Sequence, residues 1–200
     1  MKHDRLPPLP PESWTNAQRR SVQQIIDGPR GALISPFVPM LRSPELTEHS
    51  QRLGEYLRYR CALRLRLSEL AILITARHWS QQVEWAIHAP IALKEGIDAA
   101  AIADIAAGVP PATLKHDEAI VYDFCVELHR QQGVTDATWA RAVSAFGEQG
   151  VVDLIGVNGY YAYLAMMMNA ARTPVPSSSA VVPLAPMKPP ETCPCARCEL

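Results

Sequence analysis

The sequence predicts an all-α protein with a single domain. Apolar residues recur at helical spacing along most of the chain, and no period-2 alternation is long enough for a strand. The chain has 200 residues, 48% of them hydrophobic, which suits one sizeable core. We expect a Pro-rich arm at 1–13, a helical domain at 14–172 and a disordered tail at 173–200, where Pro, Ser and Ala dominate.

The first helix is expected at 13–27. Thr15 and Gln18 have the spacing of a capping box, and Gly28 ends the helical pattern. The next stretch, 28–44, contains four prolines but also apolar side chains that are unusual in a free loop. It is therefore expected to pack across the domain, over a pocket or a subunit contact, with a plain packed connector as the alternative.

Two helices follow. Pro44 suits the first turn of a helix that runs to about Arg60. The helix at 67–76 is apolar on nearly every side and is expected to be buried. On the earlier helix, the residues expected to face the core are Leu46, Leu53, Leu57 and Cys61.

The second half of the chain continues the helical pattern. A helix at 80–95 is expected to end at Gly96, and Asp98 can cap a short helix that runs to about Ala107. Asp136 can cap another helix. The remaining helices are expected at 115–132, 137–146 and 148–172.

Charge and targeting signals limit the class of protein. The formal net charge is −1, from 19 Lys and Arg against 20 Asp and Glu, and no basic patch favours nucleic acid. No apolar run reaches the roughly 18 residues expected of a membrane span. The first residues lack the apolar segment of a secretory signal, so the cytoplasm is the default expectation.

A group of side chains that could bind a ligand or transfer a proton lies on one face of the helix at 80–95. Gln81, Glu84, Trp85 and His88 are separated by helical spacing, and Glu84 and His88 can touch. A carboxylate beside an imidazole on an otherwise apolar helix is suited to proton transfer. His78 is expected to face the same cavity. A plain structural hydrogen bond between Glu84 and His88 is the alternative.

Metal binding is poorly supported by the sequence. A zinc site would need a further ligand beside the Glu/His pair, and the double-histidine motif is absent. Cys61 and Cys125 fit core positions. Cys193, Cys195 and Cys198 could bind a soft metal or oxidise, but incidental cysteines in a tail explain them better.

Two stretches carry a resemblance to a known family. The first is LSELAILITARHWSQQVEWAIHAPIALKEGI at 67–97, and the second is VVDLIGVNGYYAYLAMMMNA at 151–170. Together with an arginine on the preceding helix, they resemble the carboxymuconolactone decarboxylase family of the alkylhydroperoxidase D-like superfamily, over about 14–172. The matching positions are Arg58, Glu69 to Leu73, Glu84, Trp85, His88, Ala92 and Gly96.

One departure from the superfamily pattern bears on chemistry. Members with peroxidase activity carry a redox Cys-x-x-Cys, with a histidine four residues after the second cysteine. Counting back from His88, those positions hold Gln81 and Glu84. Thiol peroxidase chemistry at this place is therefore excluded.

The resemblance implies an alkylhydroperoxidase D-like helical bundle that forms homotrimers or homohexamers and needs no cofactor. It implies a decarboxylase, or a related lyase or isomerase, that acts on a small carboxylated lactone or cyclic acid. After carbon dioxide is lost, a dienolate must be reprotonated, and histidine can supply that proton. In this interpretation His88 donates the proton, and Glu84 orients the His88 imidazole. Arg58 binds the substrate carboxylate. The cavity is shaped by Trp85, His78 and Gln81.

Two other interpretations stay open. A non-catalytic oligomer could use the same pocket to bind a small apolar or acidic ligand, although the Glu84–His88 pair is more than binding needs. A redox role would depend only on the cysteines of the tail.

Overall fold

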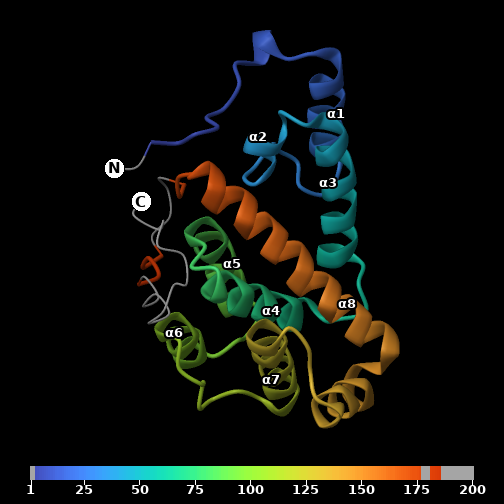
Figure 1. Cartoon of the computed structure of the whole chain (residues 1–200), viewed down its shortest axis with the longest axis vertical. Coiled ribbons are helices and arrows are strands. Elements are labelled where there is room, and N and C mark those ends of the chain that lie inside the picture. The colour runs from blue at the N-terminus through green and yellow to red at the C-terminus, as the bar shows by residue number, and fades with distance from the viewer. Residues whose placement is uncertain (1–2, 177–180, 186–200) are drawn as a thin grey trace, which may run out of the picture.

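The computed structural model describes residues 3–176 and 181–185. Within them all regular secondary structure is helical, which confirms the all-α prediction, and the helices form one compact unit (Figure 1). Cys193, Cys195 and Cys198 lie outside the described residues. The elements are η1 (Pro11–Ser13), α1 (Asn16–Asp27), α2 (Phe37–Met40), α3 (Pro44–Tyr59), α4 (Leu65–His78), α5 (Gln82–Lys94), α6 (Ala99–Ala107), α7 (His116–Gln131) and α8 (Asp136–Ala171).

Helix α4 is the centre of the core. Its side chains are buried on every side from Leu67 to Arg77, as its continuous apolar sequence predicts. It packs mainly against α5, α7 and α8. Figure 1 shows α8 running diagonally across the molecule, with α4 and α5 beside it and α6 and α7 beyond them.

Local sequence signals place most helix ends correctly. Thr15 and Gln18 form the predicted capping box at the start of α1. The Asp98 side chain accepts a hydrogen bond from the Ala100 amide at the start of α6. The last two predicted helices are joined as α8, with a break at Gly147, whose φ of 69° is outside the helical range.

The predicted core face of α3 is wrong for two residues. Leu46 and Leu53 are exposed, whereas Leu57 is buried as expected. The buried face of α3 instead carries small and polar residues, because it packs closely against α1 and α8. These residues are Thr47, Ser50, Gln51 and Gly54, and they lie on the same face as Leu57.

The N-terminal cap of α8 also differs from the prediction. Thr135, not Asp136, is the capping residue, and its hydroxyl accepts a hydrogen bond from the amide of Thr138. A threonine hydroxyl and an aspartate carboxylate are both good caps, so adjacent candidates compete for one position.

By length and hydropathy alone, α8 could also cross a membrane. A core helix passes the same test, and the inner face of α8 is buried against α4 and α7.

Described residues near both ends of the chain contact the helical body. In the arm, the Arg5 amide donates to the Ala171 carbonyl at the end of α8, at 2.8 Å. Near the other end, residues 181–185 lie against the start of α5. Leu184 exchanges two hydrogen bonds with the Gln82 side chain, both 2.9 Å, and is buried. This short segment of the predicted tail is therefore part of the packed structure.

Candidate active site

Polar side chains from three helices meet at a small, mostly enclosed cavity. Glu84 and His88 reach it from α5, Arg58 from α3, and Tyr160 and Tyr161 from α8. The fourth wall is part of the segment at 28–44, which packs across the domain as expected and lies over this pocket, one of the alternatives left open for it. From that segment, Arg30, Ile34 and Phe37 line the cavity.

His88 is held by a buried carboxylate from the neighbouring helix. Its Nδ1 lies 2.6 Å from Oε2 of Glu69 in α4, and both side chains are buried. An ionised carboxylate only accepts hydrogen bonds, so Nδ1 carries the proton and donates it. The other ring nitrogen, Nε2, makes no hydrogen bond within the described residues. It is thus left as the atom that can exchange a proton with a ligand.

Glu69 was missed as a site residue by the sequence reasoning. It belongs to the Glu-Leu-Ala-Ile-Leu run, which was interpreted as a buried helix and as a match to the family pattern, with no role given to the glutamate. The available signal was the glutamate itself, since a fully buried carboxylate is rare unless it has a partner. Glu69 has no exposed surface, and the partner is the imidazole of His88, 19 residues further along the chain.

Glu84 lies in the cavity wall but does not bond to His88. Both of its carboxyl oxygens are buried without a hydrogen-bond partner in the described part of the chain. Burial away from water disfavours the charged form and raises the pKa of the Glu84 carboxyl well above its usual value. The side chain is therefore suited to act as a neutral acid, which can donate a proton or a hydrogen bond.

The two tyrosines of α8 complete the polar wall. The ring of Tyr161 meets His88 edge-on, with centroids 5.1 Å apart. The Tyr160 hydroxyl is buried and has no partner among the described residues. It lies directly over Gly54 of α3, where a Cβ would overlap it. Burial raises the pKa of both phenols, so each remains protonated at neutral pH.

Two arginines give the cavity a positive rim. Arg58 is half-buried, its guanidinium lies 5.5 Å from the centroid of the Tyr59 ring, and it forms no ion pair or hydrogen bond with any described residue. The guanidinium of Arg30 lies over the ring of Phe37 and donates to the side chain and carbonyl of Gln51, both at 3.3 Å. Arg58 is thus the side chain more available to bind a carboxylate, because a planar guanidinium can form paired hydrogen bonds with it.

The other predicted site residues lie away from this cavity. Gln81 caps α5 by accepting from the Val83 amide, and its amide nitrogen donates to Asn169 of α8. Trp85 is buried in the core. His78 faces a different pocket, where its ring stacks on His129. Helical spacing predicts on which side of its own helix a side chain lies. It does not predict which neighbouring helix packs against that side.

The cavity is small. Its volume is about 30 Å³, enough for a water molecule, whereas binding sites for small organic molecules usually occupy several hundred Å³. A ring-sized acid can therefore enter only if a wall moves. The wall from 28–44 is the natural candidate, since only its short helix α2 is regular and the other walls belong to long helices.

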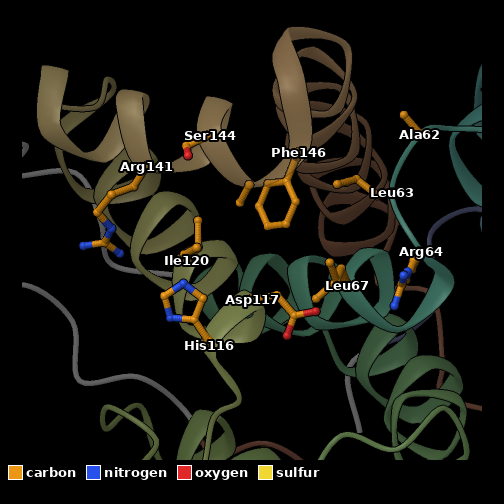
Figure 2. Close-up of a pocket in the computed structure, with 11 residues that line it drawn as sticks. Ala62, Leu63, Arg64, Leu67, His116, Asp117, Ile120, Arg141, Ser144 and Phe146 are labelled. Carbon is orange, nitrogen blue, oxygen red and sulfur yellow. The ribbon is translucent and has the colours of Figure 1, made fainter.

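A much larger hollow lies at the other end of the bundle, between the N-terminal ends of α4 and α7 and the first part of α8 (Figure 2). Its volume is about 680 Å³. Figure 2 shows Arg64 and Arg141 on opposite sides of it, with Phe146 between them. Arg141 is paired with Asp123 at 2.5 Å, and Asp117 is paired with Arg66. With its charges largely paired at the surface, this hollow offers less for catalysis than the cavity at His88.

Within residues 3–176 and 181–185, no group of three or more His, Cys, Asp or Glu side chains is placed to hold a metal ion. Burial raises the pKa of the Cys125 thiol to about 12, which makes that cysteine unreactive.

The chain matches no model of a known protein family, and no curated protein matches it.

Proposed function

We propose that this protein is a cofactor-independent proton-transfer enzyme, a decarboxylase or a related lyase or isomerase that acts on a small carboxylated lactone or cyclic acid. The observation that carries the proposal is the hydrogen bond from His88 to buried Glu69, beside the neutral acid Glu84. The resemblance to the carboxymuconolactone decarboxylase family supports the choice of substrate class.

The roles follow from the chemistry of each group. Arg58 binds a carboxylate of the substrate. When the bond to the leaving carbon dioxide breaks, its electron pair moves into the conjugated ring and produces an enolate. The hydroxyl of Tyr160 and the carboxyl of Glu84 are the donors that can stabilise the enolate oxygen, because both are protonated and have no partner in the described residues.

His88 then supplies the proton. In its charged form the imidazolium gives the Nε2 proton to the enolate carbon, and a C–H bond replaces the broken C–C bond. The carboxylate of Glu69 stabilises the imidazolium and keeps the ring in one orientation, as a buried carboxylate does for a catalytic histidine. Without loss of carbon dioxide, the same groups would move a proton between two carbons, which is isomerisation.

The proposed assembly is a homotrimer or homohexamer, as the resemblance implies, and the proposed location is the cytoplasm. One structural feature supports assembly. α8 exposes Val152, Ile155 and Met166 at helical spacing on one face, where a second helix could cover them. A non-catalytic oligomer that binds a small ligand in the same cavity remains the second candidate.

The test is a screen in deuterated water with muconolactone-type acids and β-keto acids, followed by NMR. We expect the wild type to release carbon dioxide or incorporate deuterium, and His88→Ala to be at least about a hundredfold slower. His116→Ala is the matched control, since His116 is exposed and outside the cavity. A His88→Ala variant as fast as the wild type would refute the assignment, and wild-type binding of these acids without turnover would favour the ligand-binding protein.

A further inference from the structure

A second pocket lies between α4, α6 and α7, separate from the cavity at His88. Its volume is about 100 Å³, and one side of it is apolar. Engineered cavities of roughly 150 Å³ admit benzene, and this pocket is smaller but open to solvent, so a small ring or a branched chain can enter it in part. The apolar side is formed by Ile74, Ile105, Val109 and Val126.

The other side of the pocket carries Arg77, a buried arginine without an acidic partner. Its exposed fraction is only 7%, and no carboxylate of the described chain lies within ion-pair distance. Nη1 donates to the Ala185 carbonyl at 2.7 Å, and Nε is buried with no hydrogen-bond partner in the described residues. A buried charge normally has a paired counter-charge, and the residues that the structure describes do not supply one for this guanidinium.

The remaining polar groups add positive charge and no negative charge. Arg130 lines the pocket and forms no ion pair with a described residue. His78 and His129 stack with centroids 4.6 Å apart, and Nε2 of His129 lies 3.1 Å from the Thr75 hydroxyl. Burial lowers the pKa of both imidazoles, that of His129 to about 4, so both are neutral at pH 7. The two arginines are left as the charges of the pocket.

We propose that this pocket binds a small carboxylate with an apolar body. The carboxylate would lie against the guanidiniums of Arg77 and Arg130, and the body would occupy the apolar side and contact the stacked histidines. A carboxylate matches the fork of an arginine, and the apolar wall selects an organic acid over an inorganic anion. The proposal does not depend on the function assigned to the cavity at His88.

Titration of the full-length protein with benzoate, followed by ligand-observed NMR, tests the site. Benzamide has the same shape without the charge and is expected to bind at least about tenfold more weakly than benzoate, because neutral hydrogen bonds are weaker than charge-assisted ones. Arg77→Met is expected to weaken benzoate at least about thirtyfold, the low end for removing one partner of a buried charge pair. Arg130→Gln, which changes an exposed side chain, is expected to weaken it several-fold.

Stability provides an independent readout. Arg77→Met removes a buried charge without breaking an ion pair, which offsets the loss of the hydrogen bond to Ala185, so the variant is expected to fold and to melt near the wild-type temperature. Benzoate should raise the melting temperature of the wild type and leave that of Arg77→Met unchanged. Arg141→Gln is the matched control, because Arg141 lines the other large hollow.

Variants of the cavity at His88 show at which of the two sites benzoate binds. Benzoate affinity is expected to be unchanged in His88→Ala and in Arg58→Gln. Equal benzoate affinity in wild type and Arg77→Met would overturn the proposal, and so would loss of binding in Arg58→Gln alone. Benzamide binding as tight as benzoate would show that the arginines do not select the ligand and would overturn it too.

Discussion

Helix α4 contributes to two histidine sites that differ in one respect, the presence of an acid. Near its start, Glu69 accepts a hydrogen bond from His88 inside the core. At its end, His78 stacks on His129, and the nearby charge belongs to Arg77, with no carboxylate at hand in the described residues. An imidazole beside a carboxylate can become charged and transfer a proton, whereas a stacked pair without one stays neutral. Burial alone therefore does not make a catalytic histidine.

The largest expected effect comes from removing the acid at the first site. Glu69→Gln keeps the shape of the side chain but removes the charge that stabilises the His88 imidazolium. We expect the rate of proton exchange to fall about a hundredfold or more, with little change in substrate affinity. Glu118→Gln is the control, since it removes another buried carboxylate, one paired with Arg66 far from the cavity. Equal rate losses in the two variants would indicate a general loss of structure instead.

A second prediction tests the packing of the first site. Gly54→Ala would place a methyl group on the Tyr160 hydroxyl, and we expect it to lower the free energy of unfolding by about 1–3 kcal/mol. It should also reduce activity, because Tyr160 lines the cavity. Gly159→Ala is the matched control on α8, where a Cβ meets nothing, and it should be neutral or stabilise by up to about 1 kcal/mol. Urea denaturation of both variants measures the difference, and equal effects would contradict the close contact.

The neutral acid at the first site predicts one direction of pH dependence. The folded-state pKa of Glu84 is raised, so above pH 4.5 the unfolded chain loses a proton that the folded chain keeps. Stability relative to Glu84→Gln should therefore fall as the pH rises through neutrality, with a slope of at most about 1.4 kcal/mol per pH unit. Chemical denaturation of both proteins between pH 5 and pH 8 measures the slope, and parallel curves would mean that Glu84 is ionised in the folded state.

The histidine pair at the second site predicts the opposite direction and a smaller effect. Burial lowers the folded-state pKa of His129 to about 4 from an ordinary value of 6.5. Its contribution is complete above pH 6.5 and is lost as the pH falls toward 4, because the unfolded chain then binds a proton that the folded chain excludes. His129 is partly exposed, so solvent screening reduces the expected loss to about 1–2 kcal/mol relative to His129→Gln. Denaturation between pH 4 and pH 7 would show it, and a flat difference would contradict the desolvated pair.

Much of the fold could be predicted because helix signals are local. The capping box of Thr15, the cap at Asp98 and the break next to Phe146 each depend on residues within one turn. The orientation of α3 could not be predicted, since its buried face is polar and its leucines at 46 and 53 are exposed. The close approach of α8 at Gly54 selects small residues there, and that constraint comes from a helix about a hundred residues later.

The site was predicted in part. The sequence correctly placed Glu84, His88 and Arg58 at one cavity, because two of them share a helix face and the third is implied by the family resemblance. It gave His88 the wrong carboxylate contact, Glu84 instead of Glu69. Spacing along one helix finds only neighbours on that helix, whereas the true contact joins α4 to α5. The second pocket was not predicted, since its residues come from three helices and each is ordinary in its own context.

The turn between α4 and α5 is held by residues from the end of the chain. Asn169 accepts from the Gln81 side chain and donates to the Trp79 carbonyl, across separations of 88 and 90 residues, and Arg77 donates to Ala185, 108 residues later. During synthesis, this turn therefore cannot form all of these bonds until residue 185 has been added to the chain. Contacts of such long range slow folding. A nascent chain that stops before Asn169 would lack all three of these bonds, so Asn169 and Ala185 help to fix the helices that carry both histidine sites.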